Sequence, residues 1–236
     1  MCAGIRDRRN RTKPQRKSEF GHGDHLIDLA SADETYRNRS VREFERVIEL
    51  TQSLMPYFGK ARRPSVIVSI GGFTSHERLA TDDRWPLYQR VAQSILELDT
   101  DAVNVLPQTL PPFPWYFGTQ MFSNIFVDPE DIARYCTEFE QKVCLDILHS
   151  ALTVNERGTS FHDFVEQVGP FTSHLHIVFA RGVDGEGLQI GEGDIDFAQL
   201  ATDLTAFAPQ AGFIPGIWQG HGNGGEGFWT VLERWF

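Results

Sequence analysis

Two histidines and an aspartate stand in neighbouring apolar segments, KVCLDILHS and SHLHIVFA. Asp146 interrupts the first run, where an ionised carboxylate is costly unless a cation or hydrogen-bond donors accompany it. His174 and His176 are two residues apart in the second, so on a strand both point to the same face. Carboxylates and imidazoles bind divalent metals and carry protons. These residues predict a metal or acid–base site, against the alternative of a hydrogen-bonded structural pair.

A glycine-rich acidic segment, GVDGEGLQIGEGD, follows the second histidine run. Its glycines match neither the GxGxxG fingerprint nor the Walker loop, and its acids would repel phosphate. We therefore expect a flexible loop over the site, with Glu186 and Glu192 as carboxylates that could reach it.

The elements that must position these residues alternate regularly between strand and helix. β-Branched or apolar runs predict strands, and apolar residues at steps of three and four predict helices. Ser40, with Glu43 three residues later, is the expected cap of the first helix, and Asp128 before Pro129 that of the third. The expected strands span 25–31, 63–72, 102–108, 142–150, 173–180 and 213–218, and the expected helices 31–58, 85–99, 128–140, 160–169, 196–207 and 225–236.

This alternation indicates parallel strands with crossover helices, in a (β/α) barrel or an open doubly wound sheet. Polar residues follow each successive strand, and a barrel brings all of them to one mouth, which favours the α/β TIM barrel. Five clear strands and one partial strand are about six of the eight that close such a barrel. We expect one domain over residues 21–236, incomplete at its N-terminus, with a second copy of the chain or a further N-terminal segment over the exposed sheet edges.

The long insert TLPPFPWYFGTQMFSNIF carries three prolines and six aromatic residues. It is too rigid and too apolar for a linker, so we expect it to fold over the barrel or its mouth. Trp115 then either stacks on a ligand or packs against the barrel.

Charge and composition narrow the function classes. Residues 1–20 hold seven basic and two acidic residues, a net charge of +5, and since the 236-residue chain carries −10, the remainder carries −15. Such an acidic body excludes nucleic acid as a partner of the folded part, and the basic leader is expected to be disordered or non-native. The absence of a long apolar run excludes a membrane span, and three cysteines without a CxxC pair favour the cytoplasm.

The segments KVCLDILHS, SHLHIVFARGVDGEGLQIGEGDIDF and IPGIWQGHGNGGEGFW resemble the xylose isomerase-like TIM barrels, which include sugar isomerases, epimerases and endonuclease IV. The resemblance runs from about His22 to Phe236. Within that family the chain most resembles the barrel attached to sialic-acid (N-acetylneuraminate) synthase-type proteins. The resemblance implies a divalent metal (Mn, Mg, Co or Zn) at the mouth and a sugar or sugar-phosphate substrate.

The resemblance also implies roles for particular residues. Asp146 and His176 correspond to metal ligands, and His149 and Glu186 are the expected proton carriers. Gln108, Trp115, His174 and His221 are the expected substrate contacts.

Two positions depart from the pattern, because Phe179 and Gly216 stand where the family has acids. Glu186, Glu192 or His221 could replace the lost ligands.

The function implied is a metal-dependent isomerase or epimerase that moves a proton next to a carbonyl through an enediol, in nonulosonic (sialic) acid metabolism. Because Phe and Gly bind no cation, the alternative is a catalytically degenerate sugar-binding or assembly barrel. An endonuclease IV-like phosphodiesterase is disfavoured by the acidic body.

Overall fold

The structure is a computed structural model and describes residues 25–58, 63–116, 118–189 and 191–235. The expectation of a disordered basic leader over residues 1–20 falls outside the described residues. The expected domain, from residue 25 onward, has one main hydrophobic core.

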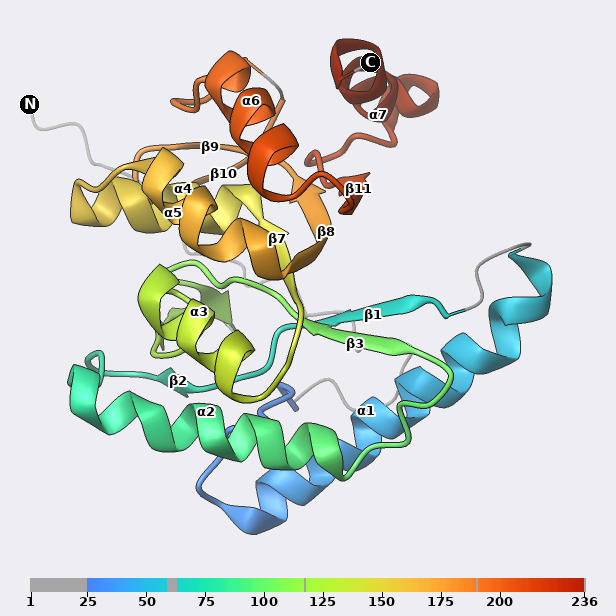
Figure 1. Cartoon of the computed structure of the whole chain (residues 1–236), viewed down its shortest axis with the longest axis vertical. Helices are drawn as coiled ribbons and strands as arrows, with labels where there is room; N and C mark the ends of the chain where they lie inside the picture. The colour runs from blue at the N-terminus through green and yellow to red at the C-terminus, as the bar shows by residue number, and fades with distance from the viewer. Residues whose placement is uncertain (1–24, 59–62, 117, 190, 236) are drawn as a thin grey trace, which may run out of the picture.

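Five short parallel strands form the centre of the molecule (Figure 1). β1 (Ser65–Val68) pairs with β3 (Asn104–Pro107), and β8 (Thr172–Ile177) pairs with β7 (Val143–Asp146) on one side and β11 (Gly212–Pro215) on the other. A single parallel bridge between Gln108 and Cys144 joins the two groups. Residues 25–28 are extended, and Leu29 N–H donates to Ile70 O beside β1, at 2.9 Å. The described residues thus supply the predicted six segments in the order of the chain.

Helices lie around the strands, and their apolar residues contribute to the main core (Figure 1). They alternate with the strands as predicted, except that two consecutive helices follow β7. The helices are α1 (Glu34–Leu54), α2 (Thr81–Leu96), α3 (Pro129–Glu138), α4 (Ile147–Arg157), α5 (Phe161–Val168), α6 (Phe197–Phe207) and α7 (Gly222–Trp235), the last with non-helical backbone at 223–225.

Among the described elements, three short antiparallel strand pairs and two single turns of 3-10 helix lie in the connecting segments. They are β2 (Phe73–Thr74) with β6 (Phe122–Ser123), β4 (Trp115–Tyr116) with β5 (Thr119–Gln120), and β9 (Phe179–Arg181) with β10 (Gly185–Leu188), together with the turns η1 (Met55–Tyr57) and η2 (Gly169–Phe171). The aromatic insert thus folds back beside β1, where Asn124 donates its side-chain amide to Gly72 O at 2.8 Å.

The expected cap of the first helix, Ser40, was wrong. α1 begins at Glu34, and Asp33 caps it by accepting the N–H groups of Thr35 and Tyr36. Ser40 lies buried inside the helix, where its hydroxyl donates to Tyr36 O and accepts the Asp28 N–H, so it joins α1 to the first extended segment. A serine hydroxyl serves either role, and only the tertiary neighbour decides between them.

Asp128 precedes α3 as predicted, but its carboxylate makes no capping bond. It is nearly buried and forms ion pairs with Arg78, Arg84 and Arg157. Arg78 lies just before α2, Arg84 in its first turns and Arg157 at the end of α4, so Asp128 ties the starts of α2 and α3 to the end of α4.

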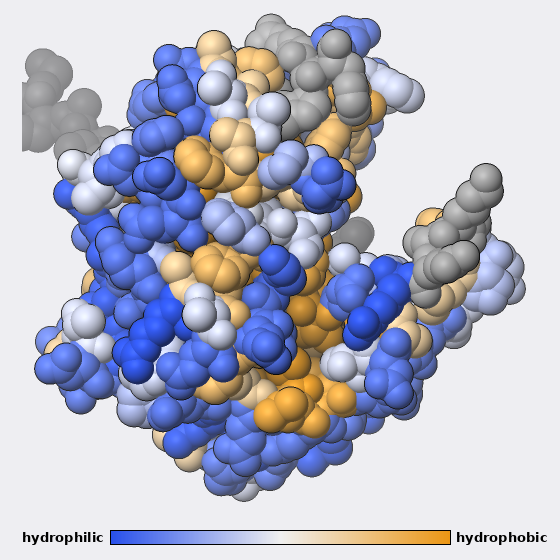
Figure 2. Space-filling model, viewed as in Figure 1, coloured by the Kyte–Doolittle hydropathy of each residue, from blue (hydrophilic) through white to orange (hydrophobic). Residues whose placement is uncertain are grey.

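Apolar residues remain exposed on one side of the molecule. Figure 2 shows them in the hollow between the projecting end of α1 and the body. On α1 itself Val47, Leu50 and Leu54 are each more than 40% exposed. Among the described strands β11 ends its sheet and pairs with β8 alone, and the expectation that a second copy or a further segment covers this edge stays a prediction. None of the described helices combines the length and apolar character that crossing a membrane requires.

α5 and α6 pack side by side and are joined by an ion pair between His162 Nδ1 and Asp203 Oδ1, 2.8 Å apart. Asp203 is buried and also accepts the Gln199 side-chain amide, whereas His162 is exposed. The hydrogen bond and charge of Asp203 raise the pKa of His162 above its usual value, with smaller contributions from Glu166 and Asp163.

We predict that this pair stabilises the fold at low pH. Since the folded pKa of His162 is raised, its contribution is complete below the unfolded pKa of about 6.5 and is lost as pH rises through the folded value. An NMR titration of His162 should show a higher pKa in the wild type than in Asp203→Asn, in which Glu166 and Asp163 leave a residual shift. Equal values in both proteins would contradict the assignment.

Candidate active site

Asp146 and His176 lie side by side at the ends of two adjacent parallel strands. The register of β7 with β8 pairs Asp146 with His176, so both side chains point to the same face of the sheet. Asp146 Oδ2 and His176 Nδ1 are 3.2 Å apart. The carboxylate is 7% exposed and the imidazole 24%, so the pair sits at the boundary between core and solvent.

A second imidazole reaches the same carboxylate from α4. This helix begins at Ile147, directly after β7, where a longer strand was expected, and Asp146 caps it by accepting the His149 N–H at 3.1 Å. One helical turn brings His149 Nδ1 to 3.4 Å from Asp146 Oδ2 and to 2.8 Å from Thr109 O. Because a carbonyl oxygen only accepts hydrogen bonds, Nδ1 of His149 carries a proton, and in the neutral form of the ring Nε2 is the nitrogen with the lone pair.

Burial and the two histidines act in opposite directions on Asp146. Burial is the largest single effect and would raise its pKa, but the charges of His149 and His176 and their hydrogen bonds together outweigh it. The net result is a pKa below the usual value, so Asp146 is ionised at neutral pH.

Thr109 and Ser69 take part in the site although no sequence pattern marked them. The Thr109 hydroxyl accepts the Asp146 N–H at 2.9 Å and contacts Ser150 Oγ at 3.1 Å, which fixes the end of β7 from the neighbouring β3 side. Ser69 accepts the side-chain amide of Gln108 at 2.8 Å. Their position just after a predicted strand could have identified them, because the side chains at the carboxyl ends of the strands meet at the mouth of a barrel.

The first pair is joined by a hydrogen bond, and the same spacing fits a divalent ion that takes the place of the proton. Two ligand atoms that each lie about 2.1 Å from one ion are roughly 3.0 to 3.4 Å apart, which matches the separation of Asp146 Oδ2 and His176 Nδ1. Gln108 ends the neighbouring strand, and since its amide nitrogen bonds Ser69, its amide oxygen is the donor that it can offer to a cation. Asp146 and His176 would therefore hold the ion, with Gln108 as a weaker third ligand.

Phe179 and Gly216 pack against apolar side chains. Phe179 is fully buried, and its ring lies 6.1 Å from that of Phe197 in the core. A Cβ atom on Gly216 would lie 2.5 Å from Cγ2 of Val178, which is itself buried. A carboxylate at either position would therefore displace apolar contacts.

The aromatic insert and the β9–β10 hairpin approach each other near the mouth. Tyr116 is half-buried, and this burial raises its pKa. Its hydrogen bond with Ser69 opposes that shift, and the nearby charge of Glu186 adds to it. Trp115, the adjacent residue, is 64% exposed. Beside Glu186, Gly187 O accepts the Trp218 N–H at 3.0 Å, which links the hairpin to the segment after β11.

The remaining expected contacts divide between two places. His174 lies two residues before His176 on β8, and the centres of the two rings are 5.8 Å apart. Burial lowers the pKa of His174, and the charge of His176 lowers it further. His221 is exposed and lines a cavity of about 610 Å³ with Glu192 and Glu226. The lining of that cavity includes neither Asp146 nor His176, so His221 is not brought to the pair.

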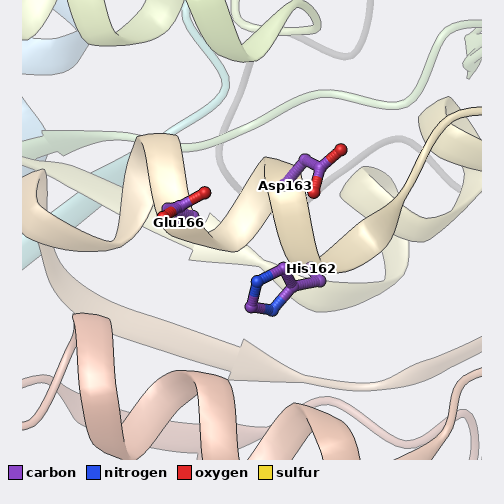
Figure 3. Close-up of side chains that lie close together, drawn as sticks. All are labelled: His162, Asp163 and Glu166. Atoms are coloured by element: carbon purple, nitrogen blue, oxygen red, sulfur yellow. The ribbon is translucent and has the colours of Figure 1, made fainter.

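Another group with ligand chemistry, His162, Asp163 and Glu166, lies on the outer helix α5 (Figure 3). All three residues are exposed, and His162 already bonds Asp203. Exposed groups of this kind are common without an ion, so we assign it no site.

Comparison with known proteins supports the architecture. A family model described as a xylose isomerase-like TIM barrel matches residues 18–227. No curated protein sequence matches the chain. Solved structures similar to it include an L-ribulose 3-epimerase (TM-score 0.59, 18% identity, 81% of this chain covered), a D-tagatose 3-epimerase-like protein (0.63, 17%, 89%) and the IOLI protein with a binding zinc atom (0.66, 12%, 88%).

The chain spans 58%, 73% and 71% of the lengths of these three structures, respectively. At such identities the likeness establishes the fold, and the family model covers most of the chain. The chain therefore belongs to the xylose isomerase-like TIM barrel family.

Proposed function

We propose that the mouth of this protein binds a small sugar or sugar phosphate and moves a proton next to its carbonyl, as an isomerase or epimerase does. The observation that carries the proposal is the convergence of Asp146, His149 and His176 at adjacent strand ends. In this proposal Asp146 and His176 hold a divalent ion, Mn, Mg, Co or Zn. When bound, such an ion polarises the carbonyl and acidifies the neighbouring C–H bond.

Proton transfer falls to His149 and Glu186. The Nε2 lone pair of neutral His149 can take the proton from the hydroxyl-bearing carbon next to the carbonyl, which leaves an enediolate, and a proton on its oxygen gives the enediol. Return of a proton to the opposite face of that carbon inverts it, and return to the adjacent carbon moves the carbonyl. Glu186, on the hairpin near Tyr116, is the second carrier.

Substrate binding is assigned to polar and aromatic groups around this pair. Gln108 and His174 flank the pair on the neighbouring strand and on β8 itself, and Trp115 offers an exposed indole for stacking on a sugar face. His221 lies in a separate polar cavity, where it would contact an extended substrate.

The wider setting follows from the resemblance to barrels of sialic-acid synthase-type proteins. It makes nonulosonic acids and their precursors the first substrates to assay. The similarity to structures of sugar epimerases supports sugar chemistry in general. Two described cysteines, Cys136 and Cys144, are free and buried, which agrees with the proposed reducing cytoplasm.

The alternative function, a degenerate sugar-binding barrel, is favoured by one specific observation. Gly216 and Phe179 are packed by apolar neighbours, so the protein has filled two positions where the family has acids. The two functions differ in whether the remaining ligands suffice for turnover.

Metal binding is tested by calorimetry with Mn²⁺. We expect the wild type to bind one ion, and Asp146→Asn to weaken binding by at least roughly tenfold, because the variant loses the anionic ligand. Asn still accepts the His149 N–H, so α4 keeps its cap. Asp163→Asn is the matched control, with the same charge change on the exposed α5 group, and should bind normally. Loss of affinity in Asp163→Asn alone would place the ion on α5.

Proton transfer is tested by deuterium uptake from D₂O into a panel of keto sugars, followed by NMR with Mn²⁺ present. We expect uptake at the carbon next to the carbonyl in the wild type and at least a roughly hundredfold slower rate in His149→Gln, since general base catalysis contributes about 10² or more. His162→Gln, an exposed histidine on α5, is the control. Uptake that survives in His149→Gln would remove this residue from the mechanism.

The degenerate alternative is tested by restoring the lost acid as Gly216→Glu together with Val178→Ala, which removes the Cγ2 atom in its way. If the barrel is degenerate, Mn²⁺ binding strengthens and deuterium uptake appears only in the double variant. Val178→Ala alone measures the packing cost, about 2 kcal/mol for a buried truncation. Uptake by the wild type equal to that of the double variant would eliminate the alternative.

A further inference from the structure

A carboxylate on another side of the mouth faces a cavity of its own. Asp28 lies in the extended segment beside β1 and lines a cavity of about 290 Å³. The lining also includes a second carboxylate, a hydroxyl and two aromatic rings, from Asp33, Ser31, Tyr36 and Phe73. Among the residues that the structure describes, no lysine, arginine or histidine lines it.

Backbone amides fix Asp28 without neutralising it. Its Oδ1 accepts the N–H groups of Ala30 at 3.0 Å and Gly72 at 2.9 Å. Gly71 has a positive φ of 94°, and a Cβ atom there would lie 2.1 Å from Asp28 Oδ1, so this close approach requires glycine. Burial raises the pKa of Asp28 despite these bonds and a weaker attraction from Arg90. The carboxylate is thus a partly desolvated charge whose nearest neighbours in the cavity are acidic or uncharged.

We propose that this cavity binds the primary ammonium group of a small ligand. An ammonium has three N–H donors, which matches two carboxylates and the Ser31 hydroxyl. The rings of Tyr36 and Phe73 provide the aromatic surroundings that favour a cation. The same two carboxylates repel a phosphate.

Contacts lead from this cavity to Gln108, the proposed third ligand. The Phe73 ring lies 4.9 Å from that of Tyr116, which hydrogen bonds Ser69, and Ser69 in turn accepts the Gln108 amide. Two kinds of ligand carry such an ammonium group. One is an amino sugar that also reaches the strand ends, and this interpretation rests on the proposed function. The other is a simple amine.

Ligand-observed NMR titrations test the site with glucosamine, N-acetylglucosamine and ethanolamine. We expect saturable binding of glucosamine and ethanolamine, and no binding of N-acetylglucosamine in the same range. Asp28→Asn should weaken glucosamine roughly tenfold, the usual effect of losing a hydrogen bond to a charged group. This variant keeps the Oδ1 acceptor for Ala30 and Gly72. Asp82→Asn, an exposed acid on α2, is the control for net charge.

Asp33→Asn provides a second variant, because asparagine also caps α1. Equal binding of glucosamine and N-acetylglucosamine, or glucosamine binding unchanged in both Asp28→Asn and Asp33→Asn, would overturn the proposal. An amino sugar as the source requires that Asp146→Asn weaken glucosamine but not ethanolamine, whereas equal retention of both identifies a simple amine. Glucosamine binding without any Mn²⁺ binding or deuterium uptake would contradict the proposed function and leave the ammonium site standing.

Discussion

The charge on one nearly buried carboxylate, Asp146, sets the geometry of the mouth. An ionised group at that depth persists only when donors replace the water it has lost. Here the replacement comes from three directions: the first turn of α4, the imidazole on that turn, and the imidazole on the adjacent strand. Thr109 holds the backbone of the same residue in place from the β3 side. Strand register, helix start and loop position are therefore coupled through a single side chain.

That coupling explains why two helices follow β7. The cap at Asp146 starts α4 at once, so this helix contacts β8 and β9, and it is α5 that packs between α3 and α6. The arrangement brings His149 to the carboxylate within one turn, which a longer strand would not do. It also brings Arg157, at the other end of α4, to the buried Asp128 that precedes α3. Two buried carboxylates thus fix the two ends of one helix.

The parts of the fold that sequence reasoning anticipated follow from local periodicity. Spacing of two placed His174 and His176 on one face, and strand–helix alternation predicted parallel pairing, which put Asp146 beside them. Errors arose where a residue had two local roles and a distant partner chose between them. Ser40 could cap a helix, but the first extended segment uses its hydroxyl. Gly216 reads as a lost acid, and only the structure shows Val178 against it. Thr109 and Ser69 belong to no motif, because their importance lies in which strand ends beside them.

Asp146 and Asp28 show that the groups which stabilise a buried carboxylate determine which cation it can bind. Imidazoles compensate Asp146, and His176 can release its hydrogen bond and become a ligand itself, so an ion can replace that bond without leaving the charge unpaired. Backbone amides compensate Asp28, and these cannot move because Gly71 and the paired segment fix them. An arriving cation must therefore add to the existing bonds rather than replace them. A compact group with its own N–H donors meets that requirement, whereas a bare divalent ion needs several anionic or lone-pair ligands that can rearrange around it.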